Sequence, residues 1–88
     1  MALPTPLEQW TAFMANVDPV PPADTTIKLV SETLIKNSIS TFASLEGWSE
    51  ADVEAVMSTA GAQPADKAFA KRVLRTIKAT AAARRRGA

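Results

Sequence analysis

Four cations recur along one side of the last third of the chain. They are Lys67, Lys71, Arg75 and Lys78. On a helical wheel turning about 100° per residue, all four fall within about 80° of one another. Arg84, Arg85 and Arg86 extend the positive charge toward the C-terminus. Such a stripe can lie along the phosphates of a nucleic acid, where each contact releases a counterion. It is also typical of a solvated helix face whose positive charge complements the helix dipole.

Acidic side chains concentrate in the middle of the chain. They are Glu46, Glu50, Asp52 and Glu54. Glu50 and Glu54, four residues apart, share one face of a helix, whereas Asp52 points away. The segment lacks the alternating oxygen ligands and the closing Glu of a calcium loop, so we predict no metal site. A solvated acidic face, or one half of an electrostatic interface, are the two interpretations that remain.

The residues that most enzymes use for acid-base and nucleophilic chemistry are missing. The sequence contains no His, no Cys and no Tyr. Their absence removes the usual general base near neutral pH, the thiol nucleophile and the common zinc ligands. We therefore expect a protein that is not an enzyme, needs no cofactor and has no small-molecule substrate.

The two tryptophans are the bulkiest apolar anchors available. Trp10 lies within a helical stripe with Leu7 and Met14, and this position predicts a core side chain. Trp48 follows Gly47, for which we expect a left-handed turn conformation. There Trp48 either packs on Val53 or stands exposed as a binding anchor, because Trp is favoured at interface hot spots.

The element boundaries follow from capping residues and prolines. Thr5, Pro6 and Glu8 form a capping-box pattern, Asp24 or Thr25 is placed to cap a second helix, and Ser49 with Asp52 opens a later one. The second helix could continue through Phe42, but the polar residues from 37 to 41 favour a break and then a short helix. The expected helices cover residues 6–16, 25–37, 41–45, 49–60 and 65–84.

The chain as a whole is predicted to be a single all-α domain. Its 88 residues suit one core, and no segment alternates with the period of a strand. We expect a compact bundle of four to five helices with a long C-terminal helix, over residues 1–83, followed by a frayed basic tail over 84–88. The predicted core contains Trp10, Leu34, Val53, Phe69, Val73 and Ile77.

The middle of the chain resembles a known family. Ile39 to Met57 reads Ile-Ser-Thr-Phe-Ala-Ser-Leu-Glu-Gly-Trp-Ser-Glu-Ala-Asp-Val-Glu-Ala-Val-Met, and a polar turn and a long helix follow. This order resembles the sterile alpha motif (SAM) and its helix-hairpin-helix relatives, without the Gly-x-Gly hairpin by which the latter hold a phosphate. The resemblance implies a SAM-like bundle with a cap at Ser49 and Asp52, and core positions at Leu45, Val53, Val56 and Ile77.

The charge distribution suggests how such a bundle would work. Residues 1–66 carry a net charge of −7 and residues 67–88 a net charge of +8. Our first hypothesis is a protein interaction module in which the acidic middle of one copy, or of a partner, meets the basic last helix of another copy. SAM domains often associate in this end-to-middle manner. The predicted contact residues are Glu46, Trp48, Glu50, Glu54, Lys67, Lys71, Arg75 and Lys78.

Two other hypotheses stay open. Nucleic acid could bind the basic last helix and Arg84 to Arg86, although the acidic body would repel phosphate. The chain could also be an auxiliary domain of a larger machine. No segment has the features of a secretory signal or reaches the roughly 20 apolar residues of a membrane span, so we expect an intracellular protein, in cytoplasm or nucleus, with no membrane partner.

Overall fold

The computed structural model describes Leu3, residues 5–17 and residues 22–87, with the last two of these described by backbone alone. Within this part of the chain all regular structure is helical and no strand occurs. The all-α prediction is therefore confirmed, as is the long C-terminal helix. The helices are α1 (Pro6–Ala15), α2 (Asp24–Lys36), α3 (Phe42–Glu46), α4 (Glu50–Thr59) and α5 (Pro64–Gly87).

Three of the helices begin at side-chain caps expected from the sequence. Thr5 and Glu8 form the capping box of α1, and Ser49 and Asp52 that of α4. The Thr41 hydroxyl accepts a hydrogen bond from the Ser44 backbone N–H, 3.2 Å away, at the start of α3. These hydroxyls satisfy backbone donors that no intrahelical carbonyl can reach.

The expected cap of α2 is wrong. Ala23 occupies the N-cap position without a side-chain hydrogen bond, and Asp24 is already the first helical residue. The Asp24 carboxylate lies in the first turn, where it interacts favourably with the helix dipole. The helix therefore begins one residue earlier than predicted.

The break after α2 is confirmed and has a defined geometry. Ser38 adopts a left-handed φ of 64°, and the Ser38 N–H donates to the Ile35 carbonyl. The Ile39 N–H donates to the Leu34 carbonyl at 2.9 Å, which completes a Schellman motif. Gly61, with φ of 76°, ends α4 in the same way. The left-handed turn predicted at Gly47 is wrong, because Gly47 has φ of −82° and caps α3 in a right-handed conformation.

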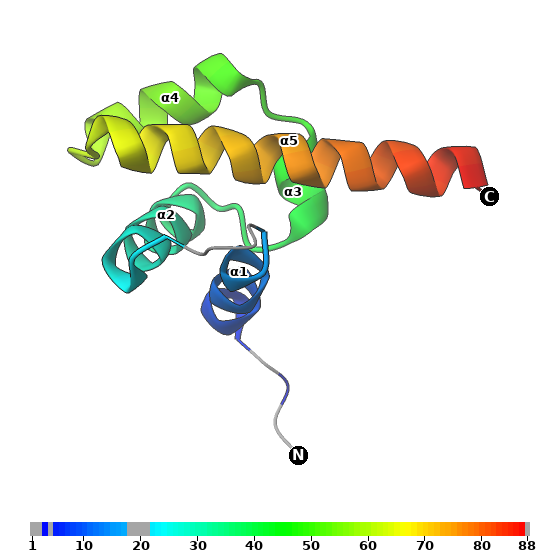
Figure 1. Cartoon of the computed structure of the whole chain (residues 1–88), viewed down its shortest axis with the longest axis horizontal. Helices are drawn as coiled ribbons and strands as arrows, with labels where there is room; N and C mark the ends of the chain where they lie inside the picture. The colour runs from blue at the N-terminus through cyan, green and yellow to red at the C-terminus, as the bar shows by residue number, and fades with distance from the viewer. Residues whose placement is uncertain (1–2, 4, 18–21, 88) are drawn as a thin grey trace.

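The helix α5 is the longest element, and its C-terminal end extends past the other helices (Figure 1). It continues to Gly87, so the helix end predicted near residue 84 is too early. Alanine-rich sequence favours helix, and the Arg85 guanidinium donates to the Ala81 carbonyl one turn earlier. Arg84 and Arg85 therefore lie on a helix. The frayed motion expected there stays a prediction.

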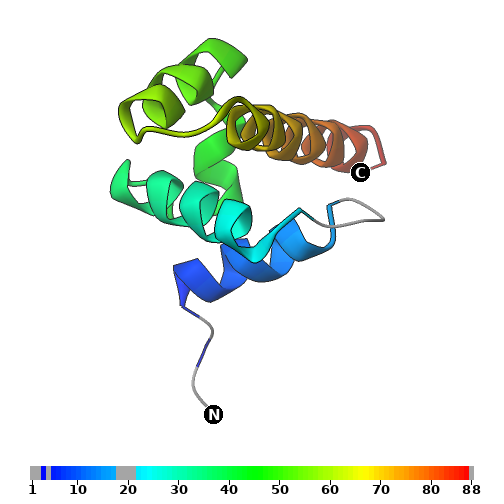
Figure 2. The same cartoon turned by 60° about the vertical axis from the view of Figure 1, so that its left-hand side comes forward.

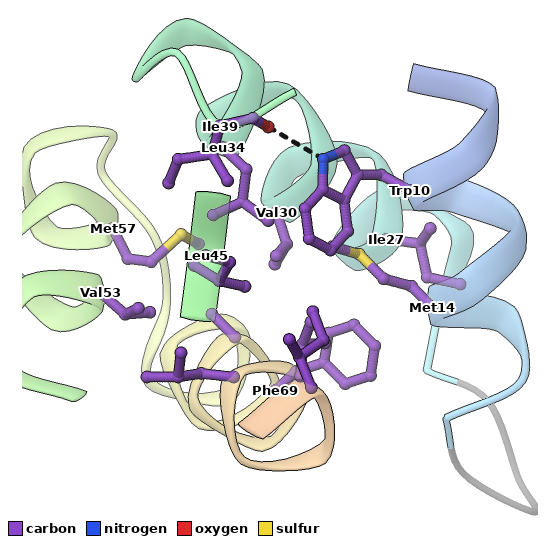
Figure 3. Close-up of a cluster of buried hydrophobic side chains, with 14 residues drawn as sticks. Trp10, Met14, Ile27, Val30, Leu34, Ile39, Leu45, Val53, Met57 and Phe69 are labelled. Atoms are coloured by element: carbon purple, nitrogen blue, oxygen red, sulfur yellow. Dashed lines mark hydrogen bonds between the residues drawn. The ribbon is translucent and has the colours of Figure 1, made fainter. Parts of the chain in front are cut away.

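The helices stack with α2 between α1 and the α4–α5 pair (Figures 1 and 2). One apolar cluster joins them, and all six predicted core residues are buried in it. The Trp10 indole N–H donates to the Ile39 carbonyl at 2.9 Å inside this cluster (Figure 3). Of the positions implied by the SAM resemblance, Leu45, Val53 and Ile77 are buried, whereas Val56 is only half-buried.

Candidate functional site

The acidic and basic residues that were predicted to form two separate binding surfaces pair with each other within one chain. The Arg75 guanidinium holds Glu50 through two hydrogen bonds, Nη2 to Oε1 at 2.8 Å and Nε to Oε2 at 3.2 Å. One turn away, the Lys71 ammonium donates to Glu54 Oε1 at 3.0 Å. Each partner lies four residues from the next on its own helix, so α4 and α5 present matching rows.

These pairs change the electrostatics of the predicted surface. The Arg75 hydrogen bond is the main reason that the pKa of Glu50 lies below its ordinary value, and the Lys71 hydrogen bond does the same for the pKa of Glu54. The Arg75 side chain is 63% exposed, so solvent screens the pair strongly. The two pairs neutralise the middle of the α4–α5 face.

Replacing Arg75 with Gln is expected to raise the pKa of Glu50 toward its ordinary value, because the foremost cause of its depression is removed. A carboxylate with a depressed pKa stabilises the fold above its unfolded-state pKa, and this contribution is lost as pH falls through the folded-state pKa. The stability difference between the variant and the wild type should therefore shrink in acid. Carboxyl chemical shifts during an NMR titration measure the pKa, with the distant Lys36→Gln as control. An unmoved Glu50 pKa would show that the pair does not form.

The remaining residues predicted on the acidic side lie around α3. Glu46 Oε1 lies 3.7 Å from Nη2 of Arg85, a third link between the acidic middle and α5. Trp48 is half-buried against the core cluster that contains Val53. This packing favours the anchoring role for Trp48 over the exposed one.

The basic residues without such pairs lie mainly toward the C-terminal end of α5. Lys78 and Arg84 are exposed, and neither has a carboxylate within ion-pair distance among the described side chains. Lys67 is half-buried near the start of the helix and also has no such pair in this part of the structure. The side chain of Arg86 lies outside the described residues. The predicted stripe is therefore divided, with its middle neutralised and its C-terminal end positive.

A groove that the sequence did not predict lies where α1 meets α3 and α5. We call it the aromatic groove, and its volume is about 470 Å³. The rings of Phe13 and Phe42 lie 5.0 Å apart in it, and Phe42 also makes an edge contact with the buried Trp10 at 4.9 Å. The described residues that line it are all uncharged: Gln9, Ala12, Phe13, Asn16, Val17, Phe42 and Thr76.

The sequence did contain a signal for this groove. Five lining residues follow the spacing i, i+3, i+4, i+7 and i+8 along α1 and its C-terminal turn, next to the buried stripe of Trp10 and Met14. Phe13 lies beside the predicted core stripe of Trp10 and Met14. Whether its ring is covered depends on which helix packs next to α1, and the periodicity of α1 does not show this.

A second hollow of about 420 Å³ separates α2 from α4. The half-buried Val56 contributes to its wall, and Glu32 and Lys36 give it charges of both signs. The hollow leaves Val56 only partly covered.

Among the described residues, the buried polar side chains all have hydrogen-bond partners. Asp66 accepts from the Thr26 hydroxyl at 2.8 Å and from the Gln63 backbone N–H at 3.0 Å, and so fixes the start of α5 to α2. Ser31 and Thr33 also donate hydrogen bonds. These hydrogen bonds satisfy the buried polar groups.

Neither a cluster of metal ligands nor a membrane-spanning helix occurs among the described residues. No group of three or more potential metal ligands comes together in them. None of their helices has the length and apolar character needed to cross a bilayer. Comparison of the chain with protein-family models, with curated proteins and with solved structures finds no match.

Proposed function

We propose that this chain is a non-enzymatic protein interaction module that receives an uncharged helical surface of its partner in the aromatic groove. The observation that carries the proposal is the composition of that groove. Phe13 and Phe42 line it with their rings, and none of the described residues that line it is charged. The centres of protein interfaces are depleted in charge and enriched in aromatic residues in the same way.

The helix that forms most of the groove supports the same function. From Thr5 to Val17, Glu8 is the one charged residue. A helix whose outer side faces only water normally carries several charges there. Ala12 and Asn16 are exposed on this helix, so a partner helix could approach its backbone closely.

The α4–α5 face is a weaker candidate for the contact than the sequence suggested. A partner that used Glu50 or Arg75 would first have to separate their hydrogen-bonded pair. Because the pair is exposed and screened, a new ion pair with a partner would gain little over the one that it replaces. The resemblance to SAM domains agrees with an interaction function, and we retain it as part of the proposal.

Photo-crosslinking in cells that make the protein tests this proposal. With benzoylphenylalanine in place of Ala12, light is expected to join the chain to a protein. The matched control carries the same group in place of Ala65, which is exposed on the first turn of α5 away from the groove. An equal yield from both positions, or no protein adduct from position 12, would contradict the proposal.

A second candidate function is nucleic-acid binding, favoured by the geometry of α5. The C-terminal half of this helix carries exposed Lys78, Arg84 and Arg85. The C-terminal end of the helix extends beyond the bundle (Figure 1). A projecting basic helix is suited to phosphate contacts, which weaken steeply with salt. Benzoylphenylalanine in place of Arg84 separates the two functions. Nucleic-acid adducts from position 84, without protein adducts from position 12, would favour this candidate.

A further inference from the structure

We infer that the partner in the aromatic groove is a second copy of this chain, with the two α1 helices packed antiparallel about a two-fold axis between Ala12 and Phe13. This inference rests on the proposed function and adds the identity of the partner. The helix α1 is the outermost element of the stack on its side of α2 (Figure 2), so a second copy can reach it.

The first argument is electrostatic. A two-fold contact places a surface against the same surface of the other copy, so a charged patch meets its own sign. The C-terminal end of α5, with Lys78 and Arg84, would repel itself. The groove side of α1 carries no charge and avoids this cost. Glu8 lies at its edge, where its carboxylate accepts hydrogen bonds from Thr5.

The second argument is the spacing of residues on α1. A two-fold axis that passes between positions 12 and 13 places residue 9 at the same height as residue 16 of the other copy. At about 100° per residue, residues 9 and 16 both point within about 10° of the other helix and so face each other across the contact. Residues 12 and 13 point about 50° to opposite sides, so each of them lies beside the same residue of the other copy.

The paired residue types fit this register. The two half-buried Phe13 rings would meet on one side of the contact, and the two exposed Ala12 side chains on the other, where their small size lets the helices approach. Gln9 would lie opposite Asn16 of the other copy, which pairs two amides. The Asn16 amide N–H already donates to the Ala12 carbonyl at 2.9 Å, and an amide group offers further donor and acceptor positions.

The absence of cysteine makes the register directly testable. The purified chain is expected to sediment as a dimer. Mixing a Gln9→Cys chain with an Asn16→Cys chain under mild oxidation should give a disulfide-linked dimer at least about tenfold faster than either variant alone. Like positions would lie about 10 Å apart along the helices, from a rise of about 1.5 Å per residue, and a disulfide does not span that distance. Ala51→Cys, exposed on α4, is the matched control.

The outcomes separate this inference from the proposed function. A monomer at all concentrations, without preferential linkage of positions 9 and 16, would overturn the two-fold pairing. If the group at position 12 still captured a different protein in cells, the proposed function would stand with another partner. If position 12 captured no protein either, both would fail. A dimer linked most efficiently through Ala51→Cys would place the contact on another face and also overturn the inference.

Discussion

Replacing Trp10 with Ala is expected to lower the free energy of unfolding by about 3–5 kcal/mol, the range for removal of a large buried aromatic side chain. The Trp10 ring is fully buried and packs edge-on against Phe42. Its indole N–H satisfies the Ile39 carbonyl, which follows the Schellman turn at the end of α2. The change therefore leaves a cavity and a buried carbonyl without its donor, two costs that add.

This loss is large relative to the stability of the molecule. At about 0.05–0.15 kcal/mol per residue, a domain of this length has a total of roughly 4–13 kcal/mol. Urea unfolding followed by far-UV circular dichroism measures the loss. Trp48→Ala is the matched control, since Trp48 is only half-buried and should cost much less. Trp10→Phe keeps a ring but removes the donor, and should lie between the wild type and Trp10→Ala. Equal losses at Trp10 and Trp48 would show that the core is placed wrongly.

Local sequence signals predicted the helices well because they depend on neighbouring residues. The capping boxes at Thr5 and Ser49 each need only residues three positions apart, and both form as predicted. The buried stripe of α5, which contains Phe69 and Val73, follows from helical periodicity alone. Errors such as Gly47 arose where several backbone conformations can end a short helix.

The candidate binding surface, formed by the aromatic groove and the charge pairs, could not be predicted in the same way, because it depends on which helices become neighbours. The sequence shows the opposite charges of α4 and α5. It does not show that these charges pair within one chain. Replacing both Lys71 and Arg75 with Glu would place like charges between α4 and α5, so the variant would report on packing within the chain as well as on assembly. The aromatic groove combines α1 with Phe42 and Thr76, which lie far away in sequence.

Introducing like charges on α1 is expected to weaken dimerisation by about 100-fold or more. In the like-charge variant, Gln9→Lys with Asn16→Lys, each new ammonium would face another across the two-fold axis. Like charges brought together at an interface cost several kcal/mol, and about 1.4 kcal/mol corresponds to a tenfold change in affinity. Both positions are exposed, so the fold should survive, which circular dichroism can check.

The matched control is the opposite-charge variant, Gln9→Lys with Asn16→Glu. It alters the same two positions but places an ammonium opposite a carboxylate of the other copy. This variant should therefore keep the dimer, and added salt should weaken it, because salt screens exposed charges beyond about 8 Å at physiological ionic strength.

Sedimentation equilibrium of the wild type and these two variants at matched concentrations is the most direct test of α1 as an interaction surface. We predict a dimer for the wild type, a monomer for the like-charge variant and a salt-sensitive dimer for the opposite-charge variant. The same mass for all three proteins at every concentration and salt level would contradict the assignment of the two-fold contact to α1.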